Sequence, residues 1–309
     1  MSSSAHLLRD RDGGAAGARP GAAQGRQGTG RDVDPTDRTR QPATSGRPGT
    51  HDERSGPQAT ASAPIKVLTI NMHKGFTAFN RRFALPELRE AIRSLSADIV
   101  FLQEVLGTHD RHAARHDNWP TAPQYEFLAD QIWTDFAYGR NAVYPHGHHG
   151  NALLSKFPIL RYENHDISIA GPEKRGLLHC VMTHPSTGKQ LHAICVHLGL
   201  REAHRQQQLD LLCRQLDRAV PPDAPLLIAG DFNDWRLRAH DALARCAGLR
   251  EVFVSTQGKA ARTFPVRWPF LRLDRIYVRN VDVLQTQVLS MQPWKHLTDH
   301  AGLFAEVRP

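Results

Sequence analysis

The chain has 309 residues, of which 23% are charged and 40% hydrophobic, and its formal net charge is +8. No apolar run approaches the roughly 18 residues needed to span a bilayer, so we expect no transmembrane segment. The excess of positive charge favours an anionic partner without identifying it.

Residues 1–63 differ in composition from the rest of the chain. After Leu8 they contain one large aliphatic residue, Val33, and no aromatic residue. Such a segment cannot bury enough apolar surface to offset the entropy lost on ordering, so we predict a disordered tail. Its nine arginines and seven acidic residues give a net charge of +2, which leaves +6 of the +8 in a predicted domain over 64–309. The acidic residues and the lack of an apolar stretch argue against a targeting peptide, and we predict a cytoplasmic protein.

Short apolar runs alternate with loops from residue 64 onward. The first run, 64–70, predicts a strand that ends at Asn71, and apolar side chains at helical spacing from Leu85 to Leu95 predict a helix. The other predicted elements are strands over 98–103, 151–154, 177–182, 191–196, 226–229, 273–278 and 302–307, and a helix over 201–219. Many strands with few helices between them favour two packed sheets covered by helices, an α/β sandwich, over a doubly wound sheet.

Polar residues stand repeatedly at the ends of these apolar runs. They are Asn71, Glu104, His197, Asp231 with Asn233, Asp274, and Asp299 with His300. A single residue of this kind is usually structural, and Asp and Asn also favour turns. Several of them in register with strand ends indicate a site at one edge of the sheets. Carboxylates for a hard cation, an amide donor and an imidazole are what metal-assisted phosphoester hydrolysis requires.

These polar residues lie in short motifs that follow one another along the chain. The motifs are Thr69–Asn71, Leu102–Val105, Gly150–Ser155, Val196–Leu198, Gly230–Asp234, Arg272–Tyr277 and Thr298–His300. In this order they resemble the endonuclease/exonuclease/phosphatase superfamily, and segments 71–80 and 195–204 look closest to an uncharacterised bacterial branch of it. The resemblance covers nearly all of 64–309. It implies a four-layered α/β sandwich of two mixed β-sheets flanked by helices, as in deoxyribonuclease I.

The resemblance also implies a metal site. Glu104 would be the principal Mg²⁺ ligand with Asn71 beside it, and Asp299 would approach the same or a second ion. Mg²⁺ accepts such a sparse ligand set, and Mn²⁺ would substitute for it. In abasic-site endonucleases the position two after the first Asn is an acidic ligand, whereas here it is His73, which argues against tight two-carboxylate binding on that side. His73 would either touch phosphate or pack in the loop.

The catalytic roles follow from the same resemblance. Asp231 would orient or deprotonate the attacking water, while Asn233 and His197 would donate hydrogen bonds to the phosphoryl oxygens. His300, held by Asp274, would be a protonated donor to phosphate or a general base. The sequence does not choose between Asp231 and His300 as the base.

Two further residues are assigned to substrate binding. Asn151 lies in one of the matching motifs, and Arg175 precedes a predicted strand, where it would clamp a phosphate or be an exposed edge residue. A Gly-rich segment nearby contains His146, His148 and His149. We interpret it as a flexible, substrate-facing loop rather than a transition-metal site, because no cysteine or carboxylate lies at useful spacing.

Basic and aromatic residues alternate near the end of the chain. They are Arg262, Arg267, Arg272, Arg275 and Arg279, with Phe264, Trp268 and Phe270 interleaved. This mixture suits a nucleic acid or an anionic membrane surface, although some of the rings are expected in the core. The sequence therefore predicts a Mg²⁺-dependent phosphoesterase that hydrolyses a phosphodiester of a nucleic acid, a phospholipid or a small molecule. The alternative is a catalytically silent nucleic-acid- or lipid-binding module on the same fold, which would normally lack one of the site's elements.

The cysteines Cys180, Cys195, Cys213 and Cys246 have no metal-like spacing. In a cytoplasmic protein we expect all of them to be reduced thiols, with at least two on apolar faces of strands or helices.

Overall fold

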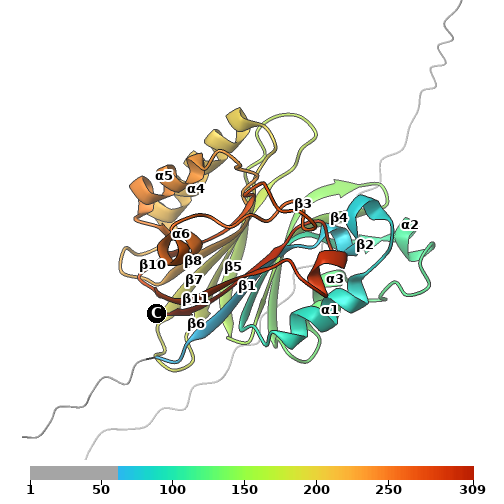
Figure 1. The fold of residues 1–309 in the computed structure, drawn as a ribbon, viewed down its shortest axis with the longest axis horizontal. Helices are drawn as coiled ribbons and strands as arrows, with labels where there is room; N and C mark the ends of the chain where they lie inside the picture. The colour runs from blue at the N-terminus through green and yellow to red at the C-terminus, as the bar shows by residue number, and fades with distance from the viewer. Residues whose placement is uncertain (1–61) are drawn as a thin grey trace, which may run out of the picture. The chain divides into compact units, whose positions relative to one another are not determined.

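Two mixed sheets of six strands each pack face to face in the computed structural model, which describes residues 62–309 (Figure 1). The predicted tail lies outside the described residues except for Ser62 and Ala63, so its disorder and the domain boundary stay predictions. Among the residues described, no helix has the length and apolar character needed to cross a membrane.

The first sheet contains the first four strands and the last two strands of the chain. Its strands are β1 (Ile65–Asn71), β2 (Ile99–His109), β3 (Asp135–Tyr144), β4 (Gly147–Ser155), β11 (Asp282–Leu289) and β12 (Gly302–Arg308). The order across the sheet is β11-β12-β1-β2-β4-β3. β1 and β2 are parallel, and the other neighbours are antiparallel. The carboxyl end of β1 therefore lies beside the middle of β2, where Asn71 is opposite Gln103.

The second sheet is formed by the middle of the chain. Its strands are β5 (Ile159–Asp166), β6 (Gly176–Thr183), β7 (Gln190–His197), β8 (Leu226–Asp231), β9 (Arg250–Glu251) and β10 (Asp274–Arg279). Their order is β5-β6-β7-β8-β10-β9. β7 and β8 are parallel, so His197 and Asp231 end neighbouring strands at the same edge. β10 runs antiparallel to β8 and begins at Asp274, directly opposite Asp231.

Helices cover the outer faces of both sheets, which gives four layers (Figure 1). α1 (Leu85–Ser94) and α3 (Gln124–Ala129) lie on the first sheet, and α4 (Glu202–Ala219) and α5 (Arg238–Ala247) lie on the second. The remaining helical segments are α2 (Asp110–Ala113), α6 (Val252–Gln257) and the 3-10 turns η1 (His73–Gly75), η2 (Ala78–Asn80) and η3 (Trp294–His296). The predicted four-layered α/β sandwich is confirmed.

Apolar side chains fill three layers of core. One core lies between the sheets, where Val67 and Phe101 of the first sheet meet Leu178 and Leu227 of the second. The others lie under the helices of each sheet. The central strands are buried on both faces, and for this reason they read as continuous apolar runs rather than as alternating patterns.

The strands that sequence reasoning missed are mostly at sheet edges. β3, β5, β9 and β11 were not expected, and most residues of β5 and β11 are exposed or half-buried. An edge strand pairs with one neighbour and needs few apolar residues, so it leaves a weak signal. In contrast, the predicted strand over 98–103 is longer than expected and continues to His109. Glu104 therefore lies inside β2 rather than after it.

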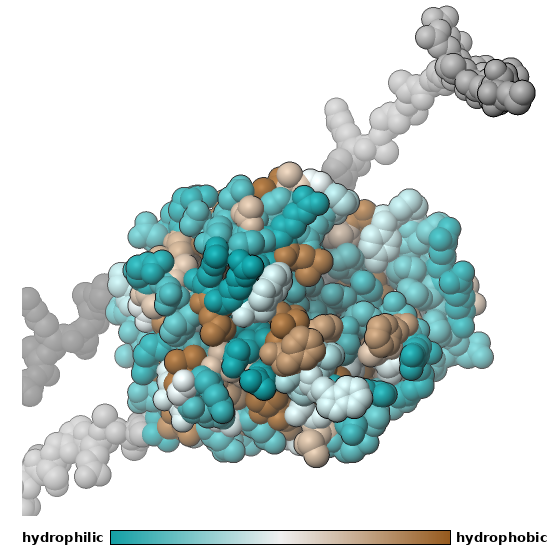
Figure 2. Space-filling model, turned by 45° about the horizontal axis from the view of Figure 1, so that its top comes forward, coloured by the Kyte–Doolittle hydropathy of each residue, from teal (hydrophilic) through white to brown (hydrophobic). Residues whose placement is uncertain are grey.

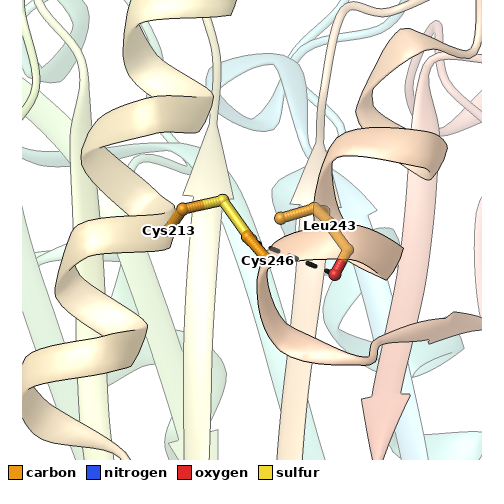
Figure 3. The surroundings of a disulfide bond; sticks show 3 residues. All are labelled: Cys213, Leu243 and Cys246. Atoms are coloured by element: carbon orange, nitrogen blue, oxygen red, sulfur yellow. Dashed lines mark hydrogen bonds between the residues drawn. A yellow bond between two sulfur atoms is a disulfide. The ribbon is translucent and has the colours of Figure 1, made fainter.

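The expectation of four reduced cysteines is wrong. A disulfide joins Cys213 of α4 to Cys246 of α5, with a Cα–Cα distance of 5.9 Å (Figure 3). A separation of 33 residues carries no signal in the sequence, because only the packing of α4 against α5 brings the sulfurs together. Cys180 and Cys195 are free and buried on the apolar strands β6 and β7, as predicted. Disulfides persist mainly in oxidising compartments, so this bridge weighs against the predicted cytoplasmic location.

Candidate active site

Strand ends from both sheets bring the predicted catalytic residues together around Asp231. Its Oδ2 accepts a hydrogen bond from Asn71 Nδ2 over 3.1 Å. His197 Nε2 lies 3.6 Å and His300 Nε2 lies 3.9 Å from the same oxygen. The other carboxylate oxygen, Oδ1, accepts from the backbone N–H of Asn233 over 2.9 Å. All five residues are buried. The strands β1, β7 and β8 and the segment before β12 thus deliver one polar cluster.

The position of Asp231 depends on close contact between β7 and β8. Gly230 precedes Asp231 and has a φ of 147°, and a Cβ at that position would lie 2.0 Å from the carbonyl oxygen of Val196. Only glycine avoids this clash, and the resulting backbone approach holds Asp231 beside His197.

Asp274 and His300 form a buried dyad behind Asp231. His300 Nδ1 lies 2.9 Å from Asp274 Oδ2, and the ring of Phe264 packs against the imidazole with a centroid distance of 4.9 Å. Burial alone would lower the pKa of His300, but the carboxylates of Asp274 and Asp231 outweigh burial and raise it to about 10. His300 is therefore an imidazolium at neutral pH, and its Nε2 lies 3.9 Å from Asp231 Oδ2.

Burial shifts the pKa values of His197 and Asp231 in opposite directions. It lowers the pKa of His197 well below its usual range, and the charge of Arg175 lowers it further, so His197 is a neutral imidazole. Burial also raises the pKa of Asp231, an effect that the positive charge of His300 opposes. The cluster therefore contains one charged and one neutral histidine on either side of a carboxylate with increased proton affinity.

Asn233 follows Asp231 in a left-handed conformation, with a φ of 50°. Its Nδ2 donates to the carbonyl oxygen of Leu198 over 2.9 Å, and Arg175 Nε donates to the same oxygen over 3.1 Å. An amide NH₂ group has two hydrogens, so one of them is still available to a ligand.

Glu104 lies beside this cluster at an irregularity of β2. The register of β2 against β4 shifts between Leu102 and Val105, and Glu104 has a φ of 56°. This bulge turns its side chain toward Asn71, whose Nδ2 lies 3.5 Å from Oε1. Burial raises the pKa of Glu104, but neighbouring basic side chains, among them the ammonium of Lys74, lower it to about 2. The carboxylate is thus ionised across the physiological range.

Glu104 and Asp299 fit a hard divalent cation. Their side chains are 21% and 19% exposed, so solvent reaches both carboxylates and water could complete a coordination shell. Asp231, Asp274 and His300 also bring ligand atoms within 4.8 Å of one another. That group is a poorer site, because His300 Nδ1 is already bonded to Asp274 and all three residues are buried away from the solvent that supplies the waters of Mg²⁺.

Sequence reasoning did not select Lys74 or Thr298. Lys74 Nζ lies 3.4 Å from Glu104 Oε2, and Thr298 Oγ1 donates to the backbone carbonyl of Asn71 over 2.8 Å. Thr298 belongs to the motif Thr298–His300 and Lys74 to segment 71–80, and this membership was the signal that could have identified them.

Asn151 and Arg175 differ in how closely they approach the site. Asn151 is buried between the sheets, where its Nδ2 donates to the carbonyl oxygens of Gly176 and Cys195 over 2.9 and 3.4 Å. Its observed contacts join the two sheets. Arg175 is mostly buried and bonds Glu173 over 2.8 Å, so it is not an exposed edge residue. It is close enough to lower the pKa of His197.

The segment with several histidines is not a flexible loop. Its residues form the tight hairpin between β3 and β4, and His148 and His149 are part of β4. His148 Nδ1 lies 2.9 Å from the hydroxyl of Tyr138. Burial lowers the pKa of His149 to about 4. The pairing of β3 with β4 continues up to Tyr144 and Gly147. The sequence does not reveal this hairpin, because its histidines break the apolar pattern that predicts a strand.

The predicted basic and aromatic cluster is divided by the fold. Arg275 is buried and donates to the carbonyl oxygens of Asp274 and Asp234 over 2.9 and 3.2 Å. Arg279 bonds the carbonyl oxygen of Pro221 over 2.7 Å. Both lie on β10 and are occupied by backbone contacts, whereas Trp268 is exposed in the loop before this strand, so they do not form a common binding surface with it.

Phe264, Arg267 and Trp268 instead line a cleft of about 770 Å³ that adjoins the site. His73 and Asp299 of the site also line this cleft. Its other lining residues include Phe79, Arg81, Arg82, Lys295 and His296, which come from η2, the loop after it and η3. Figure 2 shows a face on which apolar side chains are interspersed among polar ones.

Known proteins resemble this chain both in sequence and in structure. It is 58% identical over 251 residues to the uncharacterised protein YbhP of Escherichia coli K12, across 81% of this chain and 99% of that protein. An endonuclease/exonuclease/phosphatase from Beutenbergia cavernae superposes with a TM-score of 0.64 at 18% identity, covering 79% of this chain and 71% of that one. The TDP2 of D. rerio, complexed with a single-strand DNA product, superposes with a TM-score of 0.61 at 19% identity, covering 80% and 100%.

The profile of the Endonuclease/Exonuclease/phosphatase family matches residues 68–300, which contain every site residue described above. The chain therefore belongs to the Endonuclease/Exonuclease/phosphatase family.

Proposed function

We propose that this protein is a Mg²⁺-dependent phosphodiesterase that hydrolyses its substrate by attack of water. Membership of the family favours phosphoester hydrolysis in general. The observation that carries the finer proposal is the buried cluster in which an imidazolium, His300, and a neutral imidazole, His197, flank Asp231. Such a cluster provides donors for a developing negative charge and a carboxylate that accepts a proton.

Glu104 and Asp299 would hold the divalent ion, with Asn71 beside them, and Mn²⁺ would substitute for Mg²⁺. A bound ion of this type supplies charge stabilisation to the phosphoryl group and lowers the pKa of bound water. Asn71 Oδ1 accepts a hydrogen bond from the backbone N–H of His73 over 3.1 Å, and its second lone pair would be free to bind the ion.

Asp231 is the better candidate for the base. His300 has a pKa of about 10 and has no free lone pair at neutral pH, since Nδ1 faces Asp274 and Nε2 is protonated. In the proposed step, the water oxygen forms a bond to phosphorus and its proton passes to Asp231. The bond from phosphorus to the leaving oxygen breaks, and the leaving oxygen keeps the electron pair and takes a proton from solvent. His300, His197 and the amide of Asn233 donate hydrogen bonds to the phosphoryl group.

The cleft beside the site favours a phosphodiester that carries an aromatic base. Phe79 and Trp268 are 83% and 79% exposed, so their rings are available for stacking. The arginines and Lys295 of the cleft add positive charge for further phosphates. A cationic groove with exposed rings is typical of single-stranded nucleic-acid binding. We therefore propose a nucleic acid or nucleotide ester as the substrate. The exposed rings also suit insertion into a phospholipid surface, which is the second candidate.

Activity on defined substrates tests these proposals. Purified protein with Mg²⁺ is incubated with single- and double-stranded DNA, RNA and anionic phospholipid vesicles, alongside Glu104→Ala, Asp231→Asn and His300→Ala. We expect cleavage of an oligonucleotide that the three variants lose. Tyr162→Ala, an exposed ring on β5, is the matched control and should keep full activity.

Full activity in the Glu104 and Asp231 variants would show that the site assignment is wrong. Cleavage of the lipid alone would reject the nucleic-acid substrate but keep the phosphodiesterase. Tight binding without turnover under both Mg²⁺ and Mn²⁺ would favour the silent binding module instead.

A further inference from the structure

The turn that follows β1 places two basic side chains on the carboxylates assigned to the metal ion. Lys74 Nζ lies 3.4 Å from Glu104 Oε2, and His73 Nδ1 lies 3.3 Å from Asp299 Oδ2. The backbone N–H of His73 also donates to Asn71 Oδ1 over 3.1 Å. Each of the three assigned ligands is therefore in contact with residue 73 or 74.

The backbone of this turn is held in an unfavourable conformation. φ is 45° at His73, 58° at Lys74 and 81° at Gly75. A left-handed conformation costs roughly 1–2 kcal/mol for each residue with a side chain, so surrounding contacts must stabilise it. Gln124 provides such contacts, because its Nε2 donates to the carbonyl oxygen of Lys74 over 2.8 Å while its Oε1 accepts from Leu106 N over 2.9 Å. The fold thus fixes where both basic side chains begin.

A divalent ion at Glu104 competes directly with Lys74. Both need the same carboxylate oxygens, and an ammonium is a weaker partner for them than a doubly charged ion at the same distance. Lys74 is 37% exposed and its stem is flexible, so its ammonium can leave Glu104 without a change in the backbone. The displaced ammonium of Lys74 is still beside the site. A phosphoryl group of a bound substrate would be its new anionic partner there.

We propose that His73 and Lys74 take the place of a second metal ion. The site then binds a single divalent ion at Glu104, and the displaced ammonium of Lys74 binds a phosphoryl oxygen of the substrate. The phosphate contact rests on the proposed function. The competition between Lys74 and the ion does not, because it is a property of the protein without substrate.

Binding of Mn²⁺, followed by the loss of the free-ion signal in electron paramagnetic resonance, tests this inference without turnover. We expect one Mn²⁺ ion per wild-type chain. Lys74→Met keeps the length of the side chain but removes its charge, and should tighten Mn²⁺ binding about 1.5- to 5-fold, as expected for loss of a partly exposed ion pair. The same variant should lower kcat. Lys74→Arg, which keeps the charge, should retain the wild-type Mn²⁺ affinity.

Lys156→Met is the matched control. Lys156 Nζ lies 3.0 Å from Asp98 Oδ1, and the two side chains are 31% and 21% exposed, against 37% and 21% for Lys74 and Glu104. Asp98 precedes β2 and Lys156 follows β4, and neither side chain contacts a carboxylate assigned to the ion, so loss of this pair should leave Mn²⁺ affinity unchanged.

Two Mn²⁺ ions per wild-type chain, or unchanged or weaker Mn²⁺ binding by Lys74→Met, would overturn the proposal. Tighter Mn²⁺ binding together with a lower kcat supports the proposal. A damaged fold would instead lower both the Mn²⁺ affinity and kcat. If the wild-type protein hydrolyses no phosphoester yet Lys74→Met binds Mn²⁺ more tightly, the proposed function fails while the competition stands.

Discussion

His197 and His300 lie on either side of Asp231, but their protonation differs because their other neighbours differ. Both imidazoles are buried, which disfavours the charged form. For His300, the charge of Asp274 and its hydrogen bond, together with the charge of Asp231, reverse this effect and raise the pKa to about 10. His197 has Arg175 nearby instead, and its pKa stays well below its usual range. A single buried carboxylate therefore determines which histidine is the cation.

Asp274→Asn tests this argument at the level of one residue. Removal of the Asp274 charge lets burial dominate, so the pKa of His300 should fall from about 10. A donor with a raised pKa loses its proton only as the pH rises through that value, so the alkaline limb of the kcat/KM profile should move to lower pH in the variant. At neutral pH we expect a loss of about 10²- to 10⁴-fold, the usual contribution of a positioned proton donor.

The profile of Asp210→Asn, which changes an exposed carboxylate of α4, serves as the control and should match the wild type. An unshifted alkaline limb in Asp274→Asn would mean that the titration of His300 does not control the rate.

At the level of elements, the close approach of β7 and β8 determines where Asp231 and His197 lie. Gly230 lets the two backbones approach, and this approach places Asp231 next to His197. The sequence identified both strands from their apolar runs. It did not identify the bulge at Glu104 or the edge strand β5, because a bulge depends on the partner strand and an exposed edge carries few apolar residues.

Gly230→Ala should destabilise the protein by about 2 kcal/mol or more, as measured by urea unfolding, because a buried steric clash adds to the backbone strain. A Cβ at this position would meet the carbonyl oxygen of Val196 at 2.0 Å. Gly171→Ala is the comparison, since φ is also positive there at 84° but no atom lies within 4 Å of the added Cβ. It should cost only about 1 kcal/mol. Equal losses in the two variants would rule out the clash as the cause.

The disulfide between α4 and α5 should stabilise the outer layer of the second sheet. Cys213→Ser should lower the free energy of unfolding by about 2–4 kcal/mol, the usual contribution of a disulfide. Reductant should lower the melting temperature of the wild-type protein but not that of the variant. Thiol titration under denaturing conditions should find two thiols before reduction and four after it. Four thiols before reduction would show that the bridge does not form.

On the scale of the whole molecule, the cleft is assembled from segments that are far apart in the sequence. The turn around Phe79, the loop around Trp268 and η3 around Lys295 meet beside Asp299. The positive charge of the chain does not by itself indicate this cleft, since Arg275 and Arg279 are used in backbone contacts. Packing of the two sheets therefore decides which basic residues face a substrate.

The cleft should bind single-stranded oligonucleotides through both charge and stacking. In a fluorescence anisotropy titration with Asp231→Asn as the background, Trp268→Ala should weaken binding by about 1–3 kcal/mol, the usual cost of losing one stacked base. Arg267→Ala should weaken binding and also reduce its dependence on salt, because fewer counterions are released. Arg161→Ala on β5 should do neither. Tight, Trp268-dependent binding of anionic vesicles in place of oligonucleotides would contradict this prediction.

The sequence by itself predicted most of the central strands, a two-sheet fold and, through its motifs, the residues of the Asp231 cluster. It could do so because central strands are buried on both faces and leave continuous apolar runs, with polar residues at their ends. Only the tertiary structure decided the protonation of His197 and His300, the contact of Lys74 with Glu104, the disulfide and the cleft. Each of these depends on distances between residues far apart in the chain, and neither periodicity nor composition encodes such distances.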